Sequence, residues 1–183
     1  AEGCQISIIC PDPFFYSAGE TGTQVTVFYG VDDAFEFPFS NESLTKDLIE
    51  FGVARYSTER IIYYQGDSAI GMTVSIYATG DVRNLTIFNT RTREFFKIDT
   101  DRLAAMTGKG IVQGDSITVS TVRNDKYIKL LRDGIEYNIM NAVDRNSTWL
   151  ILERGDNIIA YTAEEGGSNL EFRIDNKIIY EGV

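Results

Sequence analysis

Short stretches of alternating polar and apolar residues recur along the whole chain. The clearest are Gln24-Val-Thr-Val-Phe-Tyr29, Met72-Thr-Val-Ser-Ile-Tyr77 and Ser116-Ile-Thr-Val-Ser-Thr-Val122. A period of two is typical of a β-strand with one face buried and the other in water. Further strands are expected at 5–10, 35–39, 60–64, 84–89, 94–99, 126–132, 135–140, 148–153, 157–162, 169–174 and 177–181. About fourteen short strands separated by turns predict an all-β protein, an antiparallel β-sandwich of jelly-roll or concanavalin-like type.

Two short connecting helices are expected, at about 43–51 and about 101–107. Each has a residue suited to an N-cap before it and a glycine after it, the usual marks of a helix start and stop. The N-cap residues are Ser43 and Thr100, and the glycines are Gly52 and Gly108. Neither helix is long enough to supply repeated crossovers between parallel strands.

The turns have a uniform composition. The pair Gly-Asp occurs at 66–67, 80–81, 114–115 and 155–156. Asp133-Gly134 and Asp175-Asn176 each lie between apolar runs, which predicts two-residue hairpin turns. No linker rich in proline or serine divides the chain, so we expect one domain over 1–183. The alternative is two tandem sandwiches, about 1–107 and 108–183.

Part of the sequence is similar to a known architecture. The stretch Gly114-Asp-Ser-Ile-Thr-Val-Ser120 is followed by a strand, by Asp133-Gly134 and by another strand. Together with Thr148–Tyr161, this resembles the later strands of galectin-like and concanavalin-like sandwiches, over roughly 114–182. The resemblance implies a fold and carries over no binding residues, because the sugar-binding histidine of galectins has no counterpart in a chain without histidine.

Composition and charge exclude several functions. The formal net charge is −10, which disfavours binding to nucleic acids and anionic membranes. No run approaches the roughly 20 apolar residues that span a bilayer. With no histidine, the chain lacks the usual general base and the commonest metal ligand. We therefore expect a protein that is not an enzyme.

Several features predict a secreted glycoprotein. Asn41, Asn84 and Asn146 each begin an Asn-X-Ser/Thr sequon. The chain opens with Ala1-Glu2-Gly3-Cys4, which is typical of a mature form after removal of a signal peptide or of a trimmed chain. Cys4 and Cys10 can form a small terminal disulfide loop only if the segment between them curls. Otherwise they pair with other chains or stay as free thiols.

Three groups of residues are candidates for binding. Arg154-Gly155-Asp156, expected at a hairpin tip, resembles the recognition tripeptide of integrin ligands, although Gly-Asp is also this chain's habitual turn. Trp149 is the only tryptophan and can stack on a sugar ring if it is exposed, or belong to the core if it is not. Asp99 and Asp101 have the alternate spacing of calcium-binding loops but lack the further ligands of an EF-hand. Calcium is the one cofactor considered, and a solvated acidic loop is the alternative.

These observations predict a non-catalytic extracellular recognition module that binds a glycan or a protein partner, as lectins and adhesins do. The first alternative is a structural or self-assembling surface or envelope protein, because so many strands leave edges that can pair between chains. The second alternative is a glycosidase that uses two carboxylates, with Glu36 between phenylalanines as one of them. The ligand itself is not identified by the sequence.

Overall fold

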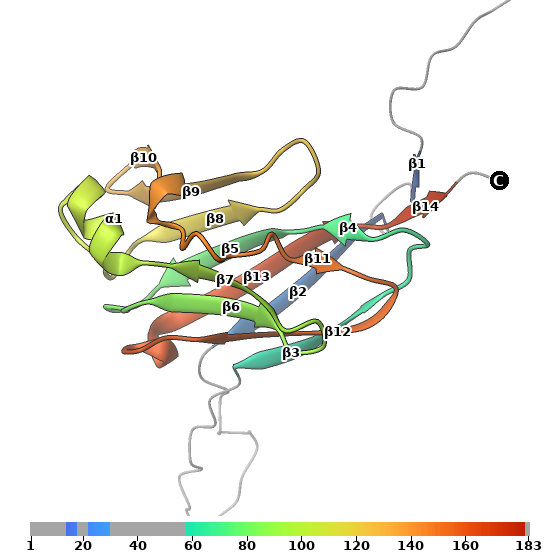
Figure 1. Ribbon diagram of the computed structural model, residues 1–183, viewed down its shortest axis with the longest axis horizontal. Coiled ribbons are helices and arrows are strands. Elements are labelled where there is room, and N and C mark those ends of the chain that lie inside the picture. Colours follow the sequence, from blue (N-terminus) through green and yellow to red (C-terminus); the bar gives the residue numbers. More distant parts are fainter. Residues whose placement is uncertain (1–13, 18–21, 30–57, 182–183) are drawn as a thin grey trace, which may run out of the picture.

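The computed structural model describes residues 14–17, 22–29 and 58–181. Most strands of the described part form two antiparallel sheets that pack face to face, which confirms the predicted sandwich (Figure 1). The finer prediction of a jelly-roll or concanavalin-like strand order stays a prediction. The predicted strands at 5–10 and 35–39 and the predicted helix at 43–51 lie outside the described residues.

The larger sheet has six strands, and the smaller sheet has four. The order in the large sheet is β10 (Ile135–Asn138), β9 (Tyr127–Arg132), β8 (Ser116–Ser120), β5 (Thr73–Ala78), β13 (Leu170–Lys177) and β2 (Thr23–Tyr29). The order in the small sheet is β3 (Glu59–Tyr64), β12 (Gly155–Thr162), β6 (Leu85–Asn89) and β7 (Glu94–Ile98). Strands from before and after residue 107 are hydrogen-bonded to one another in both sheets.

Two short ribbons complete the strands. β1 (Phe14–Tyr16) pairs with β14 (Ile179–Glu181), and β4 (Ile70–Gly71) pairs with β11 (Ile151–Leu152). Both ribbons lie at one end of the sandwich, away from α1 (Thr100–Thr107) (Figure 1). The described chain also contains two 3₁₀ turns, η2 (Met140–Ala142) and η3 (Gly167–Asn169).

The predicted alternation is confirmed in β5 and β8 of the large sheet. In β5, Val74 and Ile76 are buried, whereas the alternate residues Thr73 and Ser75 are partly exposed on the outer face. The alternation is inverted in β2, where Val25 and Val27 are exposed and lie opposite the outward residues Asp175 and Arg173 of β13.

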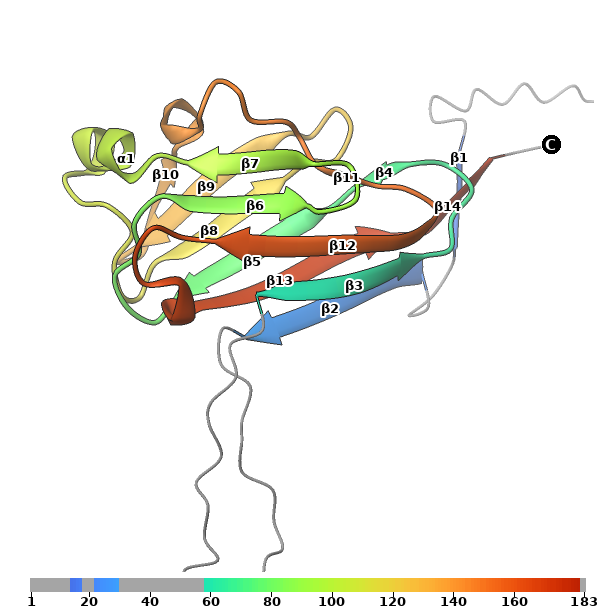
Figure 2. The same cartoon turned by 60° about the horizontal axis from the view of Figure 1, so that its bottom comes forward.

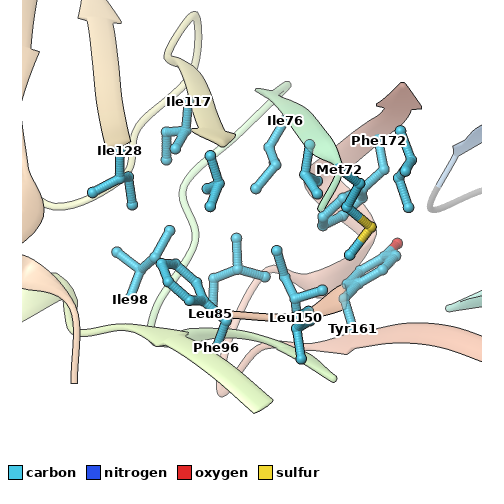
Figure 3. Close-up of a cluster of buried hydrophobic side chains, with 14 of the residues drawn as sticks. Met72, Ile76, Leu85, Phe96, Ile98, Ile117, Ile128, Leu150, Tyr161 and Phe172 are labelled. Carbon is cyan, nitrogen blue, oxygen red and sulfur yellow. The ribbon is translucent and has the colours of Figure 1, made fainter. Parts of the chain in front are cut away.

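The inward side chains of both sheets meet in one continuous apolar layer (Figure 3). Within this layer the Tyr161 ring of β12 stacks on the Phe172 ring of β13, with centroids 4.2 Å apart. The hydrophobic effect of this layer is the main stabilisation of the sandwich.

The second predicted helix is confirmed, with its cap one residue earlier than expected. Asp99, not Thr100, is the N-cap of α1: its Oδ1 accepts hydrogen bonds from the Asp101 and Arg102 backbone N–H groups. Thr100 is buried and bonds instead to Asn84. Gly108 ends the helix with φ of 82°, a left-handed conformation that glycine adopts without strain.

One predicted hairpin is confirmed and the other is wrong. β9 and β10 are joined by Asp133 and Gly134, both with positive φ, as a tight two-residue turn requires. Asp175 and Asn176 do not turn: they continue β13, which pairs with β2 over both residues. Hydrogen bonding to β2 along its whole length holds β13 straight there, and this long-range pairing overrides the local turn preference.

A buried ion pair joins the large sheet to the loop after α1. Asp115 is 1% exposed and lies beside Arg132 of β9, whose Nε donates to Asp115 Oδ1 at 2.7 Å. The guanidinium also donates to Thr107 Oγ1 and to the Gly110 carbonyl. Hydrogen bonding to the carboxylate raises the pKa of Arg132. Asp115 belongs to one of the predicted Gly-Asp turns, and the burial of its side chain could not be predicted from that turn.

Tyr64 fixes the end of the sandwich from which the β1–β14 ribbon leaves. Its hydroxyl donates to the Ser68 carbonyl at 3.1 Å and accepts from the Ile179 N–H at 3.2 Å. The side chain is fully buried, and burial raises the pKa of this phenol above its ordinary value of 10.0. Because the pKa of Tyr64 is higher in the folded protein than in the unfolded chain, its contribution to stability is complete at pH values below the unfolded pKa. That contribution is lost as the pH rises from the unfolded pKa through the folded pKa.

We expect Tyr64→Phe to lower the free energy of unfolding by about 1–2 kcal/mol near neutral pH, because the buried Ile179 N–H loses its acceptor. We also expect the difference between the two proteins to shrink above about pH 10, where the wild-type phenol must ionise on unfolding. Urea denaturation from pH 7 to 11 measures both effects. A difference that stays constant over this range would contradict the assignment.

Candidate functional site

The outer face of the small sheet is apolar where a sandwich normally meets water. On this face Ile61 of β3 lies opposite Ile158 of β12. In the next row Ala160 lies opposite Phe88 of β6, which lies opposite Phe95 of β7. We define the outer patch as these five side chains together with Tyr63, the neighbour of Ile61 on the same face of β3. It extends across all four strands, on the face that Figure 2 shows toward the viewer.

The outer patch is most exposed at β3. Ile61 is 66% exposed and Tyr63 is 62% exposed, while Phe88 and Phe95 are partly buried. The inward neighbours Ile62 and Tyr64 are fully buried. β3 is therefore apolar on both faces, a pattern typical of strands covered on both sides.

The outer face of the large sheet differs in chemistry. Its central rows carry hydroxyl side chains: Ser75 lies opposite Thr118, and Tyr77 lies opposite Ser116. Arg173 and Glu171 of β13 continue these rows with charge. A polar outer face is the ordinary arrangement for a sandwich in water. Exposed apolar side chains occur on this face too, at Val25 and Val27 of β2 and at Leu131 of β9, but the charged and hydroxyl side chains of β13 and β5 lie between these two groups.

The two edges of the small sheet are covered to different extents. Along β7, Thr148 N–H donates to the Phe95 carbonyl at 2.7 Å, and Lys97 N–H donates to Ser147 Oγ at 2.9 Å. Along β3, the Gln24 side chain donates to the Tyr63 carbonyl at 3.0 Å. Among the described residues, the 143–148 segment therefore covers β7, whereas β3 is the edge strand beside the most exposed part of the patch.

Charged side chains lie at opposite ends of the outer patch. Glu59 is exposed on β3 in the row of Ala160. Lys97 lies on β7 in the next row, opposite Thr86, with its Nζ 3.7 Å from Glu164 Oε1. The face therefore has an acidic side chain at its β3 edge and a basic one at its β7 edge.

A second feature is a cleft of about 800 Å³ at the end of the sandwich that carries the two ribbons. We call it the end cleft. Its walls come from the β1–β14 ribbon, the segment before β5, the turn after β8 and the end of β13. The lining residues are Phe14, Tyr16, Thr23, Ser68, Ala69, Ile70, Gly71, Thr73, Val122, Arg123, Asn124, Asp125, Asp175, Asn176, Lys177 and Ile179.

Asn176 is the buried polar residue of the end cleft, with 3% of its surface exposed. Its Nδ2 is 3.5 Å from Gln24 Oε1 and 3.3 Å from the Lys177 carbonyl. Its Oδ1 is buried and has no hydrogen-bond partner among the described residues. An unpaired buried acceptor is costly, so such an atom often marks the position of a bound water or ligand group.

Arg154, Gly155 and Asp156 do not form the predicted hairpin tip. Gly155 and Asp156 begin β12 and pair with Tyr64 and Tyr63 of β3, and the preceding strand β11 pairs with β4 instead. Arg154 is exposed and lies 3.5 Å from Asp67. The prediction of a hairpin was wrong because the two apolar runs belong to different sheets.

Trp149 packs against the core. Its ring centroid lies 5.3 Å from that of Phe96, and Lys126 Nζ lies 5.6 Å from the same ring. It is partly buried. This position agrees with the core alternative considered for it.

Asp99 and Asp101 do not converge on one point. Asp99 caps α1 and lies 3.3 Å from Arg102 Nε, and Asp101 is exposed in the first helical turn. Within the described ranges, no group of three or more His, Cys, Asp or Glu side chains is placed to hold a metal ion. Calcium binding stays a prediction.

The predicted modification sites are in different surroundings. Asn146 is exposed in a turn, with its N–H bonded to Asp144. Asn84 has positive φ, and its Nδ2 donates to Glu164 Oε2 at 2.8 Å, so a glycan on this nitrogen would replace one of its two hydrogens and lie beside Glu164. Asn41, Cys4, Cys10 and the carboxylate Glu36 lie outside the described residues. In the part of the chain that the structure describes, no helix is long and apolar enough to cross a membrane.

Comparison with known proteins gives little to add. No protein-family model matches the chain, and no curated protein matches it. Two solved structures are similar to it, those of the phage P2 baseplate in its activated conformation with Ca and with Sr. Each has a TM-score of 0.43 and 13% identity, over 85% of this chain and 53% of the other. The chain spans about half the length of the chains it matches, and its function has to be argued from its own residues.

Proposed function

We propose that the chain is a non-catalytic structural protein that assembles with copies of itself through the outer patch. The observation that carries this proposal is the group of apolar side chains, most exposed at Ile61 and Tyr63, on the outward face of a sheet whose inward face already forms the core. Exposing apolar surface to water costs about 25 cal/mol per Å², and covering it by a second sheet recovers that free energy. Large contiguous exposed apolar patches are typical of association sites.

The two charged side chains at the edges of the outer patch suit a second copy of the chain as the partner. In a two-fold dimer packed face to face, with the axis along the strands, β3 of one copy lies over β7 of the other. This arrangement brings Glu59 of one copy near Lys97 of the other, twice by symmetry. The net charge of −10 opposes association of identical chains at long range, so the apolar contact has to supply the affinity.

Edge strands offer a second route for larger assemblies. Among the described residues, β3 and β10 each pair with a strand on one side only. An exposed edge can accept a strand of another copy, as was expected from the number of strands. Location at a cell or particle surface is proposed from the sequence features alone.

The variant Ile61→Lys tests the proposal. We expect the wild-type protein to sediment as a multiple of 20.5 kDa and the variant to sediment near 20.5 kDa. Two-fold symmetry places two lysines in the apolar contact, which should weaken self-association by about 100-fold or more. Sedimentation equilibrium over a wide concentration range measures this shift.

Met106→Lys is the matched control, because Met106 is 41% exposed but lies on α1, outside both sheets. It should leave the association unchanged. Both substitutions are at exposed positions and should change the free energy of unfolding by no more than about 0.5 kcal/mol. A wild-type protein that stays at 20.5 kDa at all concentrations would contradict self-assembly.

A further inference from the structure

We infer that the end cleft is a binding site for a short neutral saccharide. This site uses none of the residues of the outer patch, so it stands or falls separately from self-association. The inference rests on four properties of the described residues: walls held by hydrogen bonds, an unpaired buried acceptor, balanced charge and an exposed aromatic ring.

The walls of the end cleft are held in place before any ligand binds. Thr121 N–H donates to the Met72 carbonyl at 2.9 Å, and Met72 N–H donates to Thr121 Oγ1 at 2.8 Å. Gly71 approaches this segment so closely that a Cβ on it would lie 2.3 Å from the Thr121 carbonyl oxygen. Only glycine permits this approach, which sets the loop before β5 against the turn after β8. A pre-formed site binds a ligand without an ordering cost.

The ribbon wall is anchored in the same way. Ser17 N–H donates to the Ile178 carbonyl at 3.1 Å, and Asp67 N–H donates to the Ile179 carbonyl at 3.0 Å. The Ile179 N–H donates to the Tyr64 hydroxyl, which belongs to β3 of the sandwich. The chain that passes from β13 to β14 is therefore tied both to β1 and to the loop after β3, and the cleft between them has a defined shape.

The polar groups of the end cleft suit a ligand with many hydroxyls. Asn176 Oδ1 is a buried acceptor without a partner among the described residues, and a water buried beside it is the donor that can link it to a ligand hydroxyl. Exposed Arg123 supplies donors, and exposed Asp125 supplies acceptors on the same turn. Side chains that donate and accept side by side can bond to adjacent hydroxyl groups, each of which does both.

The charges of the end cleft favour a neutral ligand. Two basic residues, Arg123 and Lys177, and two acidic ones, Asp125 and Asp175, line it. Asp175 is already bonded by the Arg173 guanidinium through both of its oxygens. The four lining charges sum to zero, and Arg173 adds one positive charge beside Asp175 on a chain whose net charge is −10, so the cleft is not the concentrated basic site that a phosphate or a polyanion needs.

Tyr16 adds an apolar surface with a polar end. Its side chain is 48% exposed on the ribbon wall, and the Lys177 ammonium lies 5.3 Å from the ring. An aromatic ring with a hydroxyl presents a flat face to the C–H groups of a sugar and a hydrogen-bonding group at its edge. The cleft volume of about 800 Å³ is within the range of sites that enclose small ligands, and it has room for a few sugar rings.

The experiment is a titration of the full chain, followed by its amide NMR signals, with neutral disaccharides and trisaccharides of glucose, galactose, mannose and N-acetylglucosamine. We expect at least one of them to shift the amides of residues 68–71 and 122–125. For that saccharide, Tyr16→Ala and Asp125→Ala should each weaken binding about tenfold or more, the loss of about one good contact. Inorganic phosphate, titrated separately, should leave these amides unshifted.

Tyr77→Ala is the matched control, because Tyr77 is 45% exposed on the outer face of the large sheet, away from the end cleft. It should leave the affinity unchanged. The inference is overturned if no saccharide shifts these amides, if phosphate alone shifts them, or if Tyr77→Ala weakens binding as much as Tyr16→Ala. Saccharide binding by a chain that stays monomeric would support this inference and contradict self-assembly. Self-association of a chain that binds no saccharide would do the opposite.

Discussion

Replacing Phe172 by alanine should lower the free energy of unfolding by about 3–5 kcal/mol, the usual cost of removing a large aromatic side chain from a core. Phe172 is 1% exposed, and its ring stacks on Tyr161 across the interface of the two sheets. Figure 3 shows both rings at one end of the apolar layer, with Met72 beside them. The substitution removes buried surface from both sheets at once and leaves a cavity that neither backbone can close.

Such a loss is a large part of the stability of an ordinary domain, which is about 5–15 kcal/mol. Urea denaturation, with the slope compared between variants, measures it. Phe15→Ala is the matched control, because Phe15 is 66% exposed, and it should change the free energy by no more than about 0.5 kcal/mol. A loss below about 1 kcal/mol at Phe172 would mean that the two sheets do not pack there as described.

The sequence predicted those parts of the fold that depend on neighbours along the chain. The period of two located the strands, and Asp133-Gly134 located a hairpin, because the backbone conformation of a tight turn is a local property. The helix end at Gly108 was predicted for the same reason. In each case the residues that decide the structure lie within a few positions of one another.

The wrong predictions concern residues whose structure is decided by distant parts of the chain. Asp175 and Asn176 have turn composition but lie in a strand, since hydrogen bonds to β2, about 150 residues earlier, hold them extended. Gly155 and Asp156 were expected at a hairpin tip, and they begin β12 because β11 and β12 pair with different partners. Periodicity shows which face of a strand is buried and contains no information on which strand lies beside it.

The two candidate sites also differ in how far local sequence could predict them. A sign of the outer patch was present in the sequence, in runs such as Arg60-Ile-Ile-Tyr-Tyr64 that are apolar on both faces. The end cleft could not be predicted, because Tyr16, Gly71, Arg123 and Asn176 come from four distant segments that only the fold brings together. No local pattern marks such residues.

Arg132→Leu is expected to have the other large effect, a loss of about 3–5 kcal/mol, because it leaves the Asp115 carboxylate buried without its cation. Asp115 is 1% exposed, and besides Arg132 it accepts a hydrogen bond only from the Val112 N–H, at 2.9 Å, among the bonds described. Arg132→Lys should restore only part of the loss, since an ammonium cannot reach Asp115, Thr107 and Gly110 together.

A double-mutant cycle separates the cost of leaving Asp115 buried without a cation from the interaction free energy of the Asp115–Arg132 pair. We expect the double variant Arg132→Leu with Asp115→Asn to be more stable than Arg132→Leu alone, because no unpaired charge remains inside while the Val112 N–H keeps an acceptor. Thermal and urea denaturation of the four proteins measure the coupling, and Arg145→Leu, at an exposed arginine, is the control. If the double variant were less stable than the wild type by the sum of the two single losses, the two side chains would act independently and the buried pair would have no role in tying the loop after α1 to the large sheet.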